Sequence, residues 1–317
     1  MTPILTIGEV MGLLTCEASG PLMRGSVMTS SVAGSEFNVA VALARLNVPT
    51  WFAGAVGHDV FGPIIERTLR AEGVDTRFLN VLADCPTGLM IKEHYGLQLE
   101  PRVHYYRRKT AMHQWVPATA MESALGDGWV HLSGISLMID PGVRQRLESW
   151  LMGWTDRHPR SLSVDLNVRR RLGEASAWKE GLKNTLPRAG LIFAGRRDLR
   201  ELWGTDDVAV LVADAVIGSD QVVIITDGGR GSQLYEGADL GETVAAWPTA
   251  HVVDPVGAGD GFAAGVLAGR ARKWGWRESI RLGSIVGAFA VSHSGDWEGY
   301  PRWDDAMAIL QSQWVDR

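Results

Sequence analysis

Strand-like and helix-like segments alternate along most of this chain, and this rhythm constrains the fold more than any other feature. Short apolar runs rich in β-branched residues are predicted to be buried strands: Pro3–Ile7, Trp51–Val56, Leu162–Asp165, Leu191–Ala194 and Gln221–Thr226. Amphipathic stretches between them are predicted to be helices: Asn38–Leu46, Val60–Glu72, Val143–Trp154 and Asp207–Ile217. Such alternation is typical of an α/β fold in which helices cover both faces of a parallel sheet.

One segment departs from this alternation. Thr87–Arg108 contains two strand-like runs around a polar turn with Gly and Pro, which predicts an antiparallel hairpin. A hairpin of this kind inside an α/β chain often forms a lid or an interface, and residues near 12–33 are expected to add strands to it. We therefore predict a single domain over residues 1–317, with a small β-lid formed by segments 12–33 and 87–108.

The composition excludes several classes of protein. The chain has 317 residues, of which 46% are apolar and 21% charged, as in ordinary globular proteins. A net charge of −5 leaves no basic footprint for nucleic acid. Cys16 and Cys85 form no CxxC pair, so neither a disulfide framework nor a thiolate metal site is expected. There is no signal-peptide pattern and no apolar run of the roughly 20 residues that cross a bilayer. We expect a cytoplasmic protein that does not bind membranes.

The most informative stretch is VVDPVGAGDGFAAG, residues 252–265. A strand-like Val252-Val253 precedes a glycine-rich turn, and Asp260 leads into a predicted helix. Glycines before a helix allow backbone N–H groups to converge on one point, where the helix dipole adds positive potential. This arrangement predicts an anion hole for a transferring phosphoryl group. A carboxylate beside such a hole is suited to taking a proton from an attacking hydroxyl.

The same residues allow two other interpretations. Asp260 could be a helix N-cap that follows an ordinary glycine turn. Gly259-x-Gly261-x-x-Ala264 also fits the dinucleotide-binding pattern formally, which would indicate a nicotinamide-dependent oxidoreductase. No clear strand ends at an acidic residue about 20 positions further on, as that pattern requires.

DPVGAGDGFAAG resembles the C-terminal signature of the ribokinase-like (PfkB) carbohydrate kinases. The N-terminal signature of that family is similar to AGSEFNVAVALARLN, residues 33–47, followed by GAVGHDVFG, residues 54–62. The resemblance implies a ribokinase-like fold and ATP-dependent phosphorylation of a carbohydrate hydroxyl. It implies that Asp260 is the catalytic base and that Gly257, Ala258 and Gly259 hold the transferred phosphoryl group.

The resemblance also implies a nucleotide site. TDGGRG, residues 226–231, is similar to the nucleotide loop of the family, although by itself it is more typical of a hairpin turn. The residues implied to bind the nucleotide are Asn167, Thr226, Gly228, Gly231, Gly257, Gly259 and Ser284. The implied cofactors are ATP and Mg²⁺, and the family also admits a monovalent cation such as K⁺ near the anion hole.

Within the family the chain is most similar to the 2-keto-3-deoxygluconate kinases. The segments that carry this similarity are PTGLMIKE, residues 86–93, VHYYRR, residues 103–108, HLSGIS, residues 131–136, and DLNVRRRL, residues 165–172. They imply a sugar-acid substrate whose keto-acid end contacts Tyr105, Arg107 and Arg169, since guanidinium groups match a carboxylate. The other implied substrate residues are Gly34, Asn38, Asp260 and Asp296.

Several departures and alternatives accompany this prediction. Ala33 stands where many relatives have glycine, and Met90 stands where the subfamily often has an aromatic residue. The NxxE motif of the family, which handles Mg²⁺, appears here as Gly195-x-x-Asp198, so no metal ligand is assigned. By themselves, Arg107 and Arg169 could be solvated charges and Tyr105 could be lid packing. The alternative substrates are fructose, ribose or a nucleoside, a silent sugar-binding regulator is a further alternative, and we expect a homo-oligomer.

Overall fold

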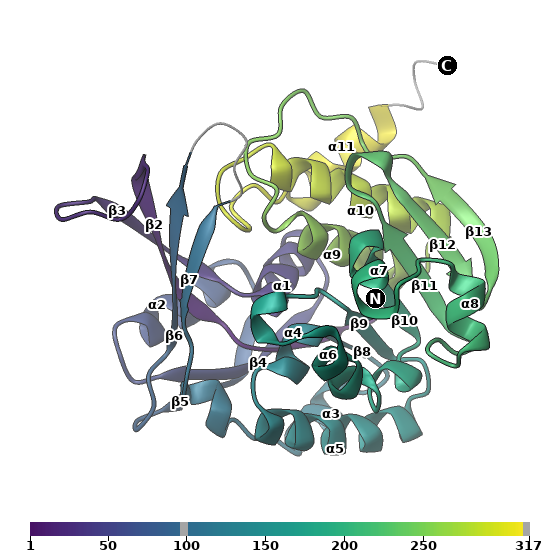
Figure 1. The fold of residues 1–317 in the computed structure, drawn as a ribbon, viewed down its shortest axis with the longest axis horizontal. Helices are drawn as coiled ribbons and strands as arrows, with labels where there is room; N and C mark the ends of the chain where they lie inside the picture. The colour runs from purple at the N-terminus through teal and green to yellow at the C-terminus, as the bar shows by residue number, and fades with distance from the viewer. Residues whose placement is uncertain (96–100, 313–317) are drawn as a thin grey trace.

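The computed structural model describes residues 1–95 and 101–312. Its largest feature is a nine-stranded sheet (Figure 1). In spatial order its strands are β13 (Asp239–Val244), β12 (Ser232–Glu236), β11 (Val222–Thr226), β10 (Leu191–Gly195), β9 (Leu162–Asp165), β8 (Trp129–Ser133), β1 (Ile4–Ile7), β4 (Thr50–Gly57) and β5 (Asp75–Leu82). The strands from β11 to β5 are parallel, and β12 and β13 continue the sheet antiparallel. The predicted α/β fold with a parallel sheet is confirmed.

Helices cover both faces of this sheet. On one face lie α3 (Ala120–Leu125), α4 (Gly134–Met138), α5 (Pro141–Arg157), α6 (Ala175–Leu182), α7 (Arg196–Trp203) and α8 (Val208–Ala213). On the other lie α1 (Ser35–Arg45), α2 (Phe61–Ala71), α9 (Ala258–Ala271), α10 (Trp276–Val291) and α11 (Trp303–Ser312). The alternation of β10 shows why two cores form: Ile192 and Ala194 pack in the first, Leu191 and Phe193 in the second.

Four further strands form a separate sheet in the order β3 (Met28–Ala33), β2 (Met11–Ser19), β6 (Gly88–His94) and β7 (Arg102–Tyr106). β6 and β7 pair antiparallel, and β2 joins β6 in parallel and β3 antiparallel. Figure 1 shows this sheet at one side of the molecule, with β2 and β3 reaching outward. The predicted hairpin and its added strands are thus present, while the turn at residues 96–100 lies outside the described residues. We call this sheet the lid sheet.

Two local expectations were wrong. The helix expected over Asp207–Ile217 is only Val208–Ala213, because the backbone reverses through Ala215 at a positive φ of 55°. Val252 and Val253 do not form a strand: both are exposed, and the sheet ends at β13. In the described part of the chain, no helix combines the length and apolar character needed to span a bilayer.

Candidate active site

A cleft of about 1110 Å³ lies between the lid sheet, the start of α9 and the segment after β9. Most residues predicted to bind substrate or phosphoryl group line it, together with Asn167, which was predicted to bind the nucleotide: Gly34, Asn38, Tyr105, Arg107, Arg169, Gly257, Gly259, Asp260 and Asp296. These residues come from five distant parts of the sequence. The segment after β9 leaves the carboxyl edge of the parallel strands, and it lies beside α9, since Asn167 Nδ2 is 3.5 Å from Asp260 Oδ1.

Asp260 lies at the centre of a hydrogen-bond cluster made of neutral donors. Its Oδ1 accepts a hydrogen bond from Ser35 Oγ at 2.7 Å, and its Oδ2 accepts one from Asn38 Nδ2 at 2.8 Å. Asn167 Nδ2 donates to Ser35 Oγ at 2.8 Å and lies 3.5 Å from Asp260 Oδ1. The carboxylate is therefore held in one orientation without an ion-pair partner that would cancel its charge.

The surroundings of Asp260 raise the pKa of its carboxyl group. Burial raises the pKa of Asp260 to about 7, although hydrogen bonds from Ser35 and Asn38 and the positive charge of Arg169 oppose the rise. Burial also raises the pKa of Asp165, and the charges of Asp260 and Asp198 add to that effect. A base with a pKa near the working pH is well suited to general-base catalysis.

The start of α9 carries the segment Gly257–Gly259, which is predicted to form the anion hole. Gly257 is the N-cap residue, with a left-handed φ of 78°, and a Cβ there would overlap the carbonyl oxygen of Asp296. A Cβ on Gly259 would meet nothing within 4 Å, so that the backbone is open to the cleft. Asp260 is not the N-cap of α9, because Gly257 occupies that position and the Asp260 carboxylate bonds to side chains of other elements.

Gly34 and Asn38 come from the junction of the lid sheet and α1. A Cβ on Gly34 would overlap the carbonyl oxygen of Glu9, so only glycine allows this close approach of the two segments. Ala33, by contrast, is a buried residue of β3 paired with Met11, and its φ is not positive. The replacement of glycine by alanine at that position therefore fits the backbone.

The two arginines predicted to hold a carboxylate have different surroundings. Arg107 Nη2 lies 2.5 Å from Glu9 Oε2, and its Cζ lies 5.8 Å from the centre of the Tyr105 ring. Arg169 donates a hydrogen bond to the neighbouring Val168 carbonyl at 3.2 Å and forms no ion pair within residues 1–95 and 101–312. Burial raises the pKa of Asp260, Asp165 and Asp198, and the positive charge of Arg169 opposes this rise in each case. Thus Arg107 already has a carboxylate partner, whereas Arg169 faces the cleft with its charge available.

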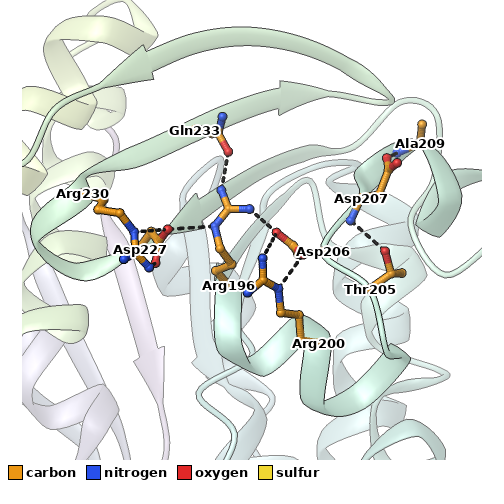
Figure 2. A network of polar contacts seen from close by, with 9 residues as sticks. All are labelled: Arg196, Arg200, Thr205, Asp206, Asp207, Ala209, Asp227, Arg230 and Gln233. Carbon is orange, nitrogen blue, oxygen red and sulfur yellow. Dashed lines mark hydrogen bonds and ion pairs between the residues drawn. The ribbon is translucent and has the colours of Figure 1, made fainter.

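The nucleotide loop expected at residues 226–231 is a hairpin turn between β11 and β12, with a 3₁₀ turn at Gly228–Arg230. Figure 2 shows the ion pairs that hold it: Arg230 and Arg196 both contact Asp227, at 2.7 Å and 3.0 Å. Hydrogen bonds from Arg230 lower the pKa of Asp227. Thr226, Gly228 and Gly231 do not line the described cleft, so their nucleotide contacts stay a prediction.

The last predicted nucleotide residue, Ser284, is buried within α10 and also lies away from the cleft lining. Residues of the dinucleotide-like pattern have a structural explanation as well. Gly261 lies in the helix α9, and a Cβ there would overlap the ring of Tyr300. The glycine at position 261 thus reflects the packing of α9 against Tyr300.

Sequence reasoning missed several residues of the cleft, among them the buried Glu9, Glu36 and Lys92 and the half-buried Ser35. Glu36 accepts hydrogen bonds from the backbone and hydroxyl of Ser133 at 2.8 and 2.7 Å, and burial raises its pKa. Lys92 stands in an apolar strand segment, and a lysine in such a place is the signal that could have drawn attention to it.

Known proteins share both sequence and fold with this chain. The model of the pfkB family carbohydrate kinases matches residues 1–303. The 2-dehydro-3-deoxygluconokinase of Bacillus subtilis is 29% identical, over 98% of this chain and 95% of its own length. A fructokinase of Klebsiella pneumoniae is 28% identical, over 87% of this chain and 91% of its own.

A solved PfkB protein from Polaromonas superposes with a TM-score of 0.82 and is 27% identical, covering 97% of this chain and all of its own. The sheet, the helices on its two faces and the lid sheet together form the ribokinase-like fold. With the family model matched over nearly the whole length and the fold shared, this chain belongs to the pfkB family of carbohydrate kinases.

Proposed function

We propose that this carbohydrate kinase transfers the γ-phosphoryl group of ATP to a hydroxyl of a 2-keto sugar acid, 2-keto-3-deoxygluconate, to give its 6-phosphate. The observation that supports this most directly is the position of Asp260. Its buried carboxylate lies in the first turn of α9, directly after the open backbone of Gly259, in a cleft that Arg169 also lines. The proposed base Asp260, the anion hole and the guanidinium of Arg169, which would bind the carboxylate of the substrate, therefore line the same cleft.

The chemical step follows from these positions. The substrate hydroxyl gives its proton to Asp260 as its oxygen bonds to the γ-phosphorus, and the bond between that phosphorus and the oxygen of ADP breaks. The backbone N–H groups of the Gly257–Gly259 segment stabilise the negative charge on the transferring group. Ser35 and Asn38 keep the Asp260 carboxylate oriented while the proton moves.

Magnesium would reach the site with the phosphates of ATP, and when bound it would neutralise charge on the transferring group. Within residues 1–95 and 101–312, no group of three or more His, Cys, Asp or Glu residues could hold a metal alone. Asp165 and Asp198 are buried carboxylates close to Arg169, and burial raises the pKa of both; a cation bound near them would favour their ionised form, in which their oxygens could serve as ligands.

The choice of a sugar acid over a neutral sugar depends on the two arginines. Arg169 and Arg107 both line the cleft, with Tyr105 on the adjacent strand β7. A bidentate guanidinium–carboxylate pair suits a keto acid, whereas a neutral ketose gives these charges no partner. The similarity to the Bacillus enzyme supports the same substrate class.

A neutral-sugar kinase is the second candidate, and the similarity to a fructokinase at 28% identity favours it. An ADP-release assay with ATP and Mg²⁺ over a panel of 2-keto sugar acids, fructose, ribose and nucleosides separates the two. We expect kcat/KM for 2-keto-3-deoxygluconate to exceed that for every neutral sugar. A higher kcat/KM for fructose or ribose would contradict the sugar-acid proposal and leave the kinase assignment in place.

A further inference from the structure

A buried lysine connects the lid sheet to the anion hole. Lys92 lies on β6, and its side chain is only 3% exposed. Its Nζ donates hydrogen bonds to Asp254 Oδ2 at 2.6 Å and to Asp296 Oδ1 at 3.3 Å. Both carboxylates are 6% exposed. One ammonium group therefore joins two buried carboxylates from segments that are distant in the sequence.

Both carboxylates belong to segments that shape the anion hole. Asp254 Oδ1 accepts a hydrogen bond from the backbone N–H of Val256 at 3.1 Å, directly before Gly257. Asp296 belongs to the loop after α10, and its carbonyl oxygen occupies the space where a Cβ on Gly257 would lie. A displacement of either segment would move the backbone N–H groups of Gly257–Gly259.

The loop that carries Asp296 is also fixed from its far side. Arg45 donates hydrogen bonds to the carbonyl oxygens of Glu298 and Tyr300 at 3.1 and 2.8 Å. Tyr300 in turn donates a hydrogen bond to the carbonyl oxygen of Gly257 at 2.7 Å. Strand β3 of the lid sheet also contacts this loop, because Trp297 Nε1 donates a hydrogen bond to the carbonyl oxygen of Val32 at 2.9 Å. Lys92 thus adds a charged contact from β6 to a loop that is already well anchored.

The charges show what the ammonium does. Burial raises the pKa of Asp296, and the charge of Lys92 opposes this rise. Burial works to lower the pKa of Lys92, but the charges of Asp296 and Asp254 outweigh it and raise that pKa. The ammonium group of Lys92 therefore already supplies, beside the anion hole, the positive charge that a bound monovalent cation would bring.

We propose that Lys92 is a positioning residue whose ammonium group replaces a bound monovalent cation and holds the anion-hole loop against the lid sheet. This inference rests on the proposed phosphoryl transfer at Gly257–Gly259. It predicts that the wild-type kinase needs no K⁺, and that removal of the ammonium creates a need for one. A direct contact of Lys92 with the substrate would instead raise KM for the sugar acid and leave kcat unchanged.

The test compares Lys92→Ala with wild type in choline buffer that lacks K⁺ and NH₄⁺. We expect kcat of the variant to fall by about 10- to 100-fold, the scale for a small misplacement of catalytic groups. Addition of K⁺ or NH₄⁺ should restore part of kcat and raise Tm in the variant alone, because these ions fit the space that the side chain leaves. Choline is too large to do so, and Lys92→Met should show no rescue because its side chain fills that space.

Arg102→Ala serves as the matched control, since Arg102 is an exposed cation of the neighbouring strand β7 and does not line the cleft. It should behave as wild type in every buffer. The Tm measurement needs no turnover, so it tests Lys92 even if the proposed substrate is wrong, and the substrate panel tests the function separately.

Three results would overturn the proposal: a K⁺ requirement in the wild type, near wild-type kcat in Lys92→Ala without added cation, or a loss that neither K⁺ nor NH₄⁺ changes. If Lys92→Ala does not fold, the double variant Lys92→Met/Asp254→Asn leaves a single carboxylate, Asp296, to be buried. That variant should fold without K⁺ and still show reduced kcat, and wild-type kcat in it would also overturn the proposal.

Discussion

The two sides of the cleft handle charge in different ways. On the side of the main sheet, neutral donors hold Asp260, and in the part of the chain that the structure describes Arg169 donates to a backbone carbonyl and to no carboxylate. On the side of the lid sheet, charged groups are paired: Arg107 with Glu9, and Lys92 with Asp254 and Asp296.

A charged group that is held by neutral donors stays available for a reaction or a ligand. Two paired charges mainly fix the geometry of their segments, because separating them would leave a buried charge without a partner, at a large desolvation cost. We propose from this difference that the main-sheet side performs the chemistry and that the lid side arranges it.

The largest effect is expected from Asp260→Asn. The amide keeps the shape of the side chain and the fold but cannot accept the hydroxyl proton, so kcat should fall by roughly 10² or more, the usual scale for a lost general base. Single-turnover assays should show the loss in the chemical step, and ATP binding, measured by calorimetry, should be retained. A kcat near that of the wild type in this variant would show that Asp260 has only a structural role in α9.

The arginines should differ in selectivity. Arg169→Ala should lower kcat/KM for the keto acid by roughly 10- to 150-fold, the value of a charge-assisted hydrogen bond, and should affect fructose much less. Arg169→Lys should recover only part of the loss, because an ammonium lacks the planar fork. Steady-state assays with both substrates provide the measurement.

Arg107→Ala should also weaken the acid selectively, but by a smaller factor, because Arg107 already pairs with Glu9. It should lower Tm as well, since the buried Glu9 carboxylate loses its partner. Equal losses for fructose and the keto acid in both variants would show that the arginines shape the site or bind ATP instead.

The pH dependence should follow Asp260. Its pKa of about 7 means that the basic form predominates only above that pH, so kcat/KM should fall below pH 7 by about 10-fold per pH unit. Asp260→Asn should lack this acidic limb, and its profile also corrects for the ionisation of ATP. A wild-type profile that stays flat down to pH 5 would contradict the raised pKa.

The smallest effect concerns closure of the lid sheet. We expect β6 and β7 to gain protection from hydrogen exchange when substrate binds, because closure removes water from the reacting groups. Lys92→Ala should weaken that protection, because the link to Asp254 and Asp296 is lost. Unchanged exchange in the wild type, with binding confirmed separately, would argue against closure.

Much of the fold could be predicted because the signals are local. The alternation of apolar runs and amphipathic stretches gave β1, β4, β9, β10 and β11 within a residue or two, and the turn chemistry gave the hairpin of β6 and β7. Predictions were wrong where local signals mislead: Val252-Val253 has strand-like composition but finds no sheet partner, and Ala215 ends a helix that the apolar pattern continued.

The α/β architecture, the glycine turn of Gly257–Gly259 and the carboxylate that follows it can all be read from the amino-acid sequence. Each of these depends on neighbours a few positions apart, through backbone freedom, helix periodicity and side-chain alternation. The pairing of the buried charges, in contrast, follows from the tertiary structure. Lys92 meets Asp254 and Asp296 across 162 and 204 positions, and Arg107 meets Glu9 between two different segments of the cleft. A short stretch of sequence cannot indicate such a pair, because the two residues meet only in the folded chain. There, a buried charge without a partner would carry a large desolvation free energy.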